Sequence, residues 1–302
     1  MSIDLFAPVL DCVGRPLRLD RARVVGILNV TPDSFSDGGS HASLEQAVAH
    51  GLRMVEEGAD MLDIGGESTR PGADDVSIEE ELSRVVPVIE QLAARTTVPL
   101  AIDTSKPEVM RAAVAAGAGM VNDVYALRRD GALDAVAALG VPVCLMHMQG
   151  EPRSMQAEPH YDDVVGEVHR FLTDRLFACE LAGIDRRKVM VDPGFGFGKS
   201  LEHNLALLRA LERFANLGSG VYVGLSRKSM IGAMTGKSTP ADRAAGSVAA
   251  ALIAVQRGAR MVRVHDVAAT VDALAVWHAV QAGDTPERRD SKPAAPRWPD
   301  DE

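Results

Sequence analysis

Short apolar runs alternate with longer amphipathic segments along most of this chain. Apolar runs of this length are typical of strands buried on both faces, as in a parallel sheet covered by helices. Eight strands are predicted, at residues 24–29, 61–65, 100–103, 120–124, 143–146, 188–191, 221–224 and 261–264. Helical patterns lie between them, near residues 44–57, 78–94, 107–116, 133–139, 164–182, 201–211, 241–257 and 267–280.

Glycine marks the passage from helix to strand at four places. The stretches EGADMLDIGG, AGAGMVNDV, LGVPVCLMH and RGARMVRVHD each end a helical pattern with Gly and continue into an apolar run. Glycine at such a position closes a helix in the left-handed conformation. Repetition of this unit predicts an α/β protein, a (β/α)8 TIM barrel in one domain over residues 1–283. A doubly wound open sheet is the alternative.

The two ends of the chain do not share this pattern. Residues 1–23 precede the first strand and are expected to form a short hairpin, with VGRP as its turn, that closes the bottom of the barrel. Residues 284–302 are rich in Pro and mixed charges. Such a composition buries too little apolar surface to fold, so we expect a disordered tail.

Composition excludes several classes of function. The formal net charge of −10 argues against broad nucleic-acid binding, which needs clustered Lys and Arg. No apolar run is long enough to span a membrane and the N-terminus lacks a signal peptide pattern, so a cytoplasmic protein is expected. The cysteines Cys12, Cys144 and Cys179 show no CxxC spacing, and Cys144 reads as a core residue.

Polar residues follow all eight predicted strands. In a barrel of this kind the active site lies at the C-terminal ends of the strands. A single polar residue there is as often a helix cap, but eight together favour a site. The exits are Asn29, GGESTRPG, Asp103, Asn122 with Asp123, His147, DPGFGFGK, LSRKS, and Arg263 with His265 and Asp266.

These exit residues divide into two chemical sets. The first offers cationic and neutral hydrogen-bonding groups suited to a small phosphorylated anion, namely Asn29, Thr69, Arg70, Arg263 and His265. The second combines carboxylates, an amide and an ammonium, which suit the donors and acceptors of a planar, amide-like base. Its members are Asp103, Asn122, Asp192 and Lys228.

The successive motifs resemble those of the dihydropteroate synthase family, in order, over roughly residues 20–280. They are ILNVTPDSFSDGG, GGESTRPGA, AIDTSKP, VNDV, MHMQGEPRSMQ, VDPGFGFGK, VGLSRKSMIG and VRVHDV. The resemblance implies a transferase of folate biosynthesis. It would join 6-hydroxymethyl-7,8-dihydropterin pyrophosphate to p-aminobenzoate and release 7,8-dihydropteroate and pyrophosphate.

The resemblance also implies a role for each site residue. The pterin would contact Asp103, Asn122, Met146, Asp192, Lys228 and Arg263. The pyrophosphate would contact Asn29, Thr69, Arg70, Arg263 and His265, with Mg2+ as the cofactor and Asn29 as its ligand. The p-aminobenzoate would lie against Phe35, Thr69, Pro71, Phe197 and Ser229. The catalytic residues would be Arg70, Asp103, Lys228, Arg263 and His265.

The substrates suggest the chemistry and the partners. Departure of pyrophosphate from the pterin leaves a cation that the ring delocalises, so an SN1-like reaction is expected, with most of the catalysis on the leaving-group side. The stretch LNVTPDSFSDGG has more polar residues than a turn requires and is interpreted as a mobile lid, with Phe35 over the aromatic amine. The resemblance further implies a homodimer and competition by sulfonamides.

Two other functions and two other motifs agree less well with the sequence. A pterin-binding methyltransferase of the corrinoid type should not need TPDSFSDGG, STRPG and SRKS together, and a paralogue without activity should have lost some of these loop residues. The run GFGFG lacks the GxGxxG spacing of a dinucleotide site and is interpreted as shaping a loop. His147 is interpreted as a core or loop histidine rather than a ligand.

Overall fold

A closed parallel barrel forms the centre of the molecule. The computed structural model describes residues 7–31, 40–68, 75–150 and 159–282. The barrel strands follow one another in the order β10-β3-β4-β5-β6-β7-β8-β9. They are β3 (Arg23–Asn29), β4 (Met61–Gly65), β5 (Leu100–Asp103), β6 (Met120–Asp123), β7 (Val143–Met146), β8 (Val189–Asp192), β9 (Val221–Val223) and β10 (Ala259–Val264).

Pairing between the first and last barrel strands closes the ring. Met261 of β10 lies opposite Arg23 of β3, and Val264 lies opposite Gly26, in parallel register. An open sheet would leave these edges unpaired. The (β/α)8 barrel expected from the sequence is therefore confirmed, and the open doubly wound sheet is excluded.

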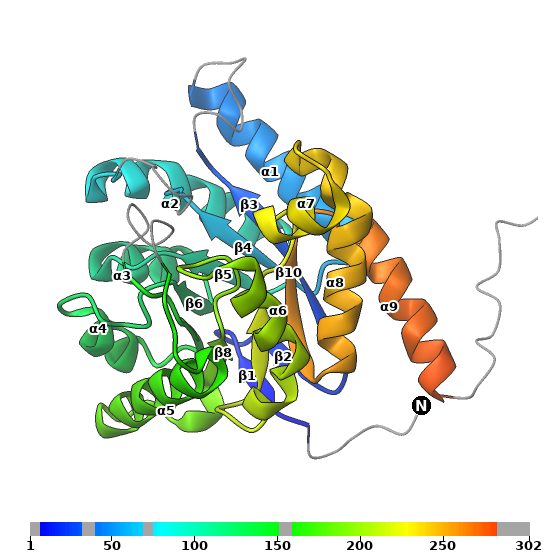
Figure 1. Cartoon of the computed structure of the whole chain (residues 1–302). Coiled ribbons are helices and arrows are strands. Elements are labelled where there is room, and N and C mark those ends of the chain that lie inside the picture. The colour runs from blue at the N-terminus through cyan, green and yellow to red at the C-terminus, as the bar shows by residue number, and fades with distance from the viewer. Residues whose placement is uncertain (1–6, 32–39, 69–74, 151–158, 283–302) are drawn as a thin grey trace, which may run out of the picture.

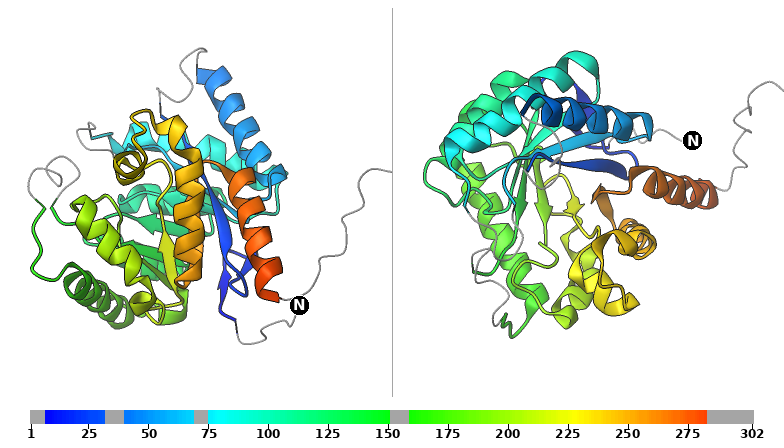
Figure 2. Two further views of the ribbon diagram at one scale, coloured as in Figure 1. Left: turned by 45° about the vertical axis from the view of Figure 1, so that its right-hand side comes forward. Right: turned by 90° about the horizontal axis from the view of Figure 1, so that it is seen from above.

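Helices cover the outside of the barrel, as Figures 1 and 2 show. Among the described residues these are α1 (Ser40–Glu56), α2 (Ile78–Arg95), α3 (Pro107–Ala116), α4 (Ala132–Leu139), α5 (Val164–Leu181), α6 (Leu201–Arg209), α7 (Ser229–Thr235), α8 (Ala244–Gln256) and α9 (Val267–Ala282). Short 3-10 turns lie at Arg186–Lys188, Leu211–Phe214 and Pro240–Arg243. No helix in the described ranges is both long and apolar enough to cross a membrane.

The helix ends confirm the role expected of glycine. Gly58, Gly117, Gly140 and Gly258 all have positive φ, between 66° and 118°, and each follows a helix that precedes a strand. Glycine adopts this conformation without the steric cost that a Cβ would bring. The repeated sequence unit therefore marks the turn that returns the chain to the barrel.

Several predicted boundaries differ from the structure. Helix α7 was not predicted, because its seven residues are too few to show a helical period. The strand expected at 188–191 is Val189–Asp192, since Lys188 ends a 3-10 turn. The helix expected from residue 241 begins at Ala244, after the 3-10 turn Pro240–Arg243.

Two apolar layers hold the barrel together. Outward-facing strand residues pack with the helices in one large buried cluster. Inward-facing residues form a second cluster inside the barrel, consisting of Val25, Met61, Ala101, Met120, Cys144, Met190, Tyr222 and Met261 with four residues from the N-terminal segment. Cys144 is thus a buried core residue, as expected, and its thiol is free.

The N-terminal segment plugs one end of the barrel. Strands β1 (Val9–Asp11) and β2 (Pro16–Arg18) pair in antiparallel register, and Leu10, Cys12, Leu17 and Leu19 join the interior cluster. The turn is Cys12–Arg15 rather than VGRP, because Pro16 already pairs in β2. A Cβ at Gly119 would lie 2.4 Å from the carbonyl oxygen of Cys12, so only glycine permits this close approach. The expected hairpin at the bottom of the barrel is confirmed.

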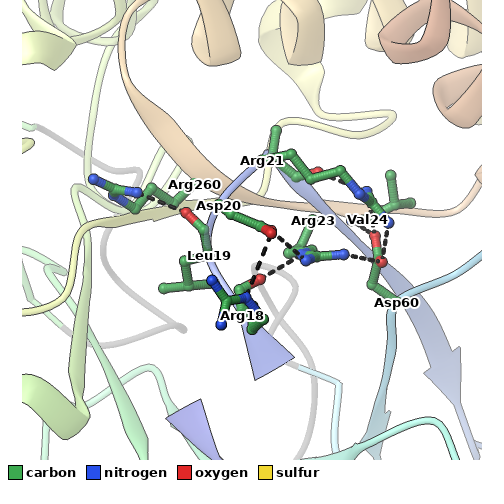
Figure 3. Close-up of polar contacts among 9 residues, drawn as sticks. Arg18, Leu19, Asp20, Arg21, Arg23, Val24, Asp60 and Arg260 are labelled. Carbon is green, nitrogen blue, oxygen red and sulfur yellow. Dashed lines mark hydrogen bonds and ion pairs between the residues drawn. The ribbon is translucent and has the colours of Figure 1, made fainter. Parts of the chain in front are cut away.

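A polar network lies on one side of this plugged end, where strands β3, β4 and β10 begin (Figure 3). The guanidinium of Arg23 pairs with Asp20 at 2.6 Å and with Asp60 at 2.9 Å. Oδ2 of Asp60 also accepts the backbone N–H of Val24 at 2.9 Å, and Arg260 donates to the carbonyl oxygen of Leu19 at 2.7 Å. These contacts join the hairpin to the starts of β3, β4 and β10.

Candidate active site

Strand alternation brings five of the predicted site residues to the inside of the barrel. Successive side chains of a strand point to opposite faces, so a residue two positions after an interior residue also points inward. This relation to the interior cluster holds for Asp103, Asn122, Met146, Asp192 and Arg263, which follow Ala101, Met120, Cys144, Met190 and Met261. All five lie at or near the C-terminal end of their strand.

Pairing between neighbouring strands places several of these residues side by side. Asp103 lies opposite Asn122, and Met146 lies opposite Asp192. Asn29 lies opposite Gly65, which in turn lies opposite Asp103. Strand pairing therefore places these predicted residues together at one end of the barrel.

Arg263 is the centre of this end. Its Nε lies 2.5 Å from Oδ2 of Asp63 and its Nη2 lies 2.7 Å from Oδ2 of Asp103. Oδ2 of Asp63 also accepts from Nδ2 of Asn122 at 2.9 Å and from the hydroxyl of Tyr222 at 3.4 Å. One buried carboxylate thus orients both the guanidinium and the amide.

The carboxylates around Arg263 outnumber it. Burial raises the pKa of Asp103 to about 7, and Asp63, Glu81 and Asp123 add to the effect while Arg263 opposes it. Oδ1 of Asp63 is buried and has no hydrogen-bond partner within the described ranges. A ligand that offers N–H donors would complete this arrangement.

Asp192 and Lys228 form the opposite side of the site. Oδ1 of Asp192 accepts the backbone N–H of Gly194 at 2.7 Å, and burial raises its pKa. The ammonium of Lys228 donates to the carbonyl oxygen of Phe195 and lies 4.6 Å from the centre of the Phe197 ring. Burial and Arg263 lower the pKa of Lys228 to about 8, although Asp192 and Asp103 oppose the shift.

An apolar cluster lies beside these charges. Val124, Met146 and Met148 are buried together, with Tyr125 and Phe197 packed against them. Flat aromatic and thioether groups of this kind suit contact with a planar ring. The site therefore combines a polar edge with an apolar face.

His265 follows β10 and is fixed by the loop after β9. Its Nδ1 lies 3.0 Å from Oγ of Ser226, which also accepts the backbone N–H of His265 at 3.1 Å. Arg227, which has a positive φ of 59°, holds Asp266 through two hydrogen bonds of 2.5 and 3.0 Å. The loops carrying Lys228 and His265 are thus linked.

Glycines shape the loop after β8, as the sequence suggested. A Cβ at Gly194 would lie 1.8 Å from the carbonyl oxygen of His147, and one at Gly198 would lie 2.5 Å from that of Gln149. Both glycines have positive φ. The run GFGFG therefore lets two strand exits approach closely, which is a different role from phosphate binding.

His147 lies in this contact as a buried partner of Lys199. Its Nδ1 is 2.9 Å from Nζ of Lys199, which also donates to the carbonyl oxygens of Gly194 and Phe197 at 2.9 Å. Burial, Lys199 and Arg128 lower the pKa of His147 to about 2. The interpretation of His147 as a core or loop residue agrees with this position.

The remaining predicted residues differ in what the structure says of them. Asn29 is half-buried at the end of β3, and Ser229 is exposed in the first turn of α7. Four residues lie outside the described residues, namely Phe35, Thr69, Arg70 and Pro71, as do the tail 284–302 and most of the expected lid. Within the described ranges no group of three or more His, Cys, Asp or Glu side chains could hold a metal ion.

Sequence reasoning missed Asp63 and Lys199. Asp63 stands in the otherwise apolar run MLDIG, and a charge inside a buried strand is the signal that could have identified it. Lys199 ends the motif GFGFGK, and nothing in this motif indicates that its ammonium is buried. Both residues orient groups that line the site.

Comparison with known proteins identifies the family of this chain. The family described as "Pterin binding enzyme" matches residues 25–265. Dihydropteroate synthase of Escherichia coli (strain K12) is 53% identical over 266 residues, which is 88% of this chain and 94% of that protein.

Solved structures agree in fold and sequence. Dihydropteroate synthase of Xanthomonas albilineans, solved with 4-aminobenzoic acid, is 67% identical with a TM-score of 0.88, and the match covers 91% of this chain and 99% of that one. The same enzyme has been solved with 7,8-dihydropteroate, at a TM-score of 0.84 and 65% identity over 91% of this chain and 99% of that one. The Yersinia pestis enzyme, solved with a sulfonamide drug complex, is 50% identical with a TM-score of 0.86, over 91% and 99% of the two chains. The chain therefore belongs to the pterin-binding enzyme family and, within it, to the dihydropteroate synthases.

Proposed function

We propose that this protein joins 6-hydroxymethyl-7,8-dihydropterin pyrophosphate to p-aminobenzoate, giving 7,8-dihydropteroate and pyrophosphate. The observation that carries the proposal is the arrangement around Arg263, where Asp63 and Asp103 hold a largely buried guanidinium beside Asn122. Support comes from the relatives solved with 4-aminobenzoic acid and with 7,8-dihydropteroate.

The polar edge suits the pterin ring. Asp192 and Asp103 would accept from the N–H groups of the ring, while Asn122 offers both a donor and an acceptor. Lys228 would donate to the ring oxygen in place of its present contact with the Phe195 carbonyl. Met146 would pack on the ring face together with Phe197.

The anion side would hold the pyrophosphate. Arg263 and His265 lie on and just after β10, and we propose that they act there with Asn29, Thr69 and Arg70. Asn29 is a single neutral ligand, so its chemistry fits Mg2+ only together with phosphate oxygens and water, which is the usual company of this ion. When bound, Mg2+ would neutralise charge on the departing pyrophosphate.

The chain's own residues would then favour an SN1-like reaction. Positive charge from Arg70 and Arg263, together with hydrogen bonding from His265, would stabilise the pyrophosphate as its bond to the pterin CH2 breaks. Asp103 and Asp192, in their ionised forms, would place negative charge next to the ring as it becomes cationic; burial raises the pKa of both, and Arg263 and Lys228 respectively oppose the shift. No strong base is required, because an aromatic amine is already neutral at pH 7 and needs only to be held close.

We place p-aminobenzoate between the loops after β4, β8 and β9. Phe197 would supply an aromatic contact and Ser229 an exposed hydroxyl for the carboxylate, with Thr69, Pro71 and Phe35 completing its surroundings. Sulfonamides would compete for this position, as the sulfonamide complex of the Yersinia pestis relative suggests. We further propose a homodimer that acts in the cytoplasm.

Direct synthesis tests the proposal. Purified protein incubated with both substrates and Mg2+ should form 7,8-dihydropteroate and pyrophosphate in equal amounts, measured by chromatography. A sulfonamide should raise the KM for p-aminobenzoate without changing kcat. Absence of dihydropteroate from folded protein that still binds the pterin would contradict the proposed function.

A further inference from the structure

Lys106 lies in a buried ion cluster beside the site rather than in it. It follows β5 and is the N-cap residue of α3. Its Nζ lies 2.8 Å from Oε2 of Glu67 and 2.5 Å from Oε2 of Glu81. Lys106 is 7% exposed and Glu81 is completely buried. None of these three residues belongs to the sets assigned above to the substrates.

Glu67 connects this cluster to both sides of the segment 69–74. One oxygen binds Lys106, and the other, Oε1, accepts the backbone N–H of Val76 at 3.1 Å. Glu67 comes before the segment and Val76 comes after it. A single carboxylate therefore ties the two ends of the segment to each other and to Lys106.

Helix α2 also holds the backbone that leads into the segment 69–74. Nη1 of Arg84 donates to the carbonyl oxygen of Gly66 at 2.7 Å. A Cβ at Gly66 would lie 2.8 Å from Cγ1 of Val85 and 3.1 Å from Cγ of Glu81. The backbone just before Glu67 is thus pressed against α2, and Glu67 has a fixed starting point.

The charge balance of the cluster favours a positioning role. Glu81 alone would neutralise Lys106, and a second, partly buried carboxylate adds a desolvation cost. Glu67 supplies what Glu81 does not, namely an oxygen that reaches Val76. Lys106 in turn supplies a positive charge that both carboxylates contact. Burial alone would lower the pKa of Lys106, but Glu67 and Glu81 hold it above its usual value.

We propose that Lys106, acting through Glu67, is a positioning residue for the segment 69–74. The proposal rests on the proposed function for the roles of Thr69, Arg70 and Pro71, which this segment contains. The residues assigned to the pterin lie on β5, β6, β7, β8 and β10 and in the loop after β9, and none bonds to Glu67 in the described part of the chain. Disturbing the cluster should therefore impair use of p-aminobenzoate and release of pyrophosphate while sparing pterin binding.

The matched pair Glu67→Gln and Glu81→Gln tests this directly. Each change removes one negative charge and leaves Lys106 one carboxylate. Gln at position 67 has one acceptor oxygen for two donors, so the link to Val76 or the link to Lys106 is lost. We expect Glu67→Gln to raise the KM for p-aminobenzoate and lower kcat, each by about tenfold, as for loss of one charge-assisted hydrogen bond. Glu81→Gln should have a much smaller kinetic effect, because Glu67 keeps its contacts with Lys106 and with the backbone N–H of Val76.

Variants of Lys106 extend the test. Lys106→Met should impair kcat and the KM for p-aminobenzoate as Glu67→Gln does, and Lys106→Arg should restore most of both. The affinity for 6-hydroxymethylpterin, which lacks pyrophosphate, should stay within about twofold in Glu67→Gln and in both Lys106 variants, as expected for separate sites. Lys188→Met is the control, since Lys188 donates to Gly140 at the other end of the barrel and should leave the kinetics unchanged.

Hydrogen exchange separates this inference from the proposed function. The amide of Val76 should exchange faster in Glu67→Gln than in wild-type protein, and Glu81→Gln should leave it protected. An inactive wild type would overturn the proposed function, while the exchange result would still decide whether Glu67 anchors the segment. Wild-type kinetics and unchanged Val76 exchange in folded Glu67→Gln would overturn the inference.

Discussion

The two ends of the barrel carry the same kind of charge group in different surroundings. At the end where strands begin, Arg23 lies between Asp20 and Asp60; at the other end, Arg263 lies between Asp63 and Asp103. Both arginine side chains are largely buried, at 14% and 19% exposed. The geometry of the ion pairs alone therefore does not tell a structural end from a functional one.

The carboxylates distinguish the two ends. Slight burial would raise the pKa of Asp20, but Arg23, a backbone hydrogen bond and Arg18 outweigh it, so this pKa lies below its usual value. Burial raises the pKa of Asp103 to about 7 despite its contact with Arg263. At the first end, ion pairing outweighs the effect of burial on the carboxylate pKa. At the second end, burial outweighs the ion pairing. A bound ligand can supply the hydrogen bonds or the charge that a buried, incompletely paired carboxylate lacks.

The largest expected effect is loss of Arg263. We expect Arg263→Ala to lower kcat/KM by about 100- to 1000-fold, the usual result of removing one group that stabilises transition-state charge. The substitution also leaves Asp63 and Asp103 without their cation. Steady-state kinetics measures the loss, and circular dichroism checks the fold. A loss of less than about fivefold would place the anion elsewhere.

Asp192→Asn should have the next largest effect. The amide keeps the shape of the side chain but presents an NH2 or a neutral oxygen to a ring edge rich in donors. Losing a charged hydrogen bond costs about 1.5–3 kcal/mol, so pterin affinity should fall about 10- to 150-fold. Calorimetric titration measures the affinity. Unchanged affinity in a folded variant would remove Asp192 from the pterin contacts.

The shifted pKa values predict a narrow pH range for the enzyme. Lys228 is charged below its pKa of about 8 and loses its charge as the pH rises through that value. Asp103 is ionised above its pKa of about 7 and gains a proton as the pH falls through it. The kcat/KM for the pterin substrate should therefore be highest between about 7 and 8 and fall about tenfold per pH unit on each side.

Lys228→Arg is the control for the alkaline side of this profile. Arginine keeps its charge at every accessible pH. The kcat/KM of Lys228→Arg should therefore not fall above pH 8, even if its highest value is below that of the wild type. A wild-type profile that stays level to about pH 9.5 would show that the charge of Lys228 does not matter for binding.

The smallest expected effect lies at the end where the strands begin. Arg23→Ala removes two ion pairs, but Asp20 keeps its pair with Arg18 and Asp60 keeps its pair with Arg21, so each loss should cost about 1 kcal/mol, the upper end of the range for exposed pairs. The melting temperature should fall by a few degrees, at about 2–4 °C per kcal/mol for a chain of this size, with kcat/KM unchanged. Because the pKa of Asp20 is lowered in the folded state, its share of this stability exists above about pH 4 and is lost below it. A large loss of activity would contradict the structural role of this end.

Sequence periodicity predicted the barrel because its signal is repeated. Eight apolar runs and four helix-closing glycines report the same unit, so an error at one boundary does not change the fold. Short elements carry no such repetition: α7 was missed, and the hairpin turn was misplaced by one residue. The polar residues at strand ends were found for the same reason, since each follows a recognisable run.

Contacts between distant segments could not be predicted in the same way. Asp63 acts on Arg263, which is 200 residues further along the chain, and Glu67 reaches Lys106 over 39 residues. Local pattern does not record which of many buried carboxylates meets which cation. The roles of Asp63, Lys199 and Glu67 therefore become visible only when the barrel places their partners.

The central claim is that residues at one end of the barrel promote cleavage of the bond between the pterin CH2 and pyrophosphate, while residues at the other end stabilise the fold. Isotope exchange tests this claim most directly. The substrate is pterin pyrophosphate with 18O in the oxygen that joins the pterin CH2 to phosphorus. It is incubated with enzyme and Mg2+ but without p-aminobenzoate. We expect the label to move to non-bridging positions, or the ester to hydrolyse slowly, in wild type and in Arg23→Ala, and to remain in place in Arg263→Ala. Absence of both exchange and hydrolysis in the wild type would contradict stepwise departure of pyrophosphate, and equal loss in Arg23→Ala would contradict the division between the two ends.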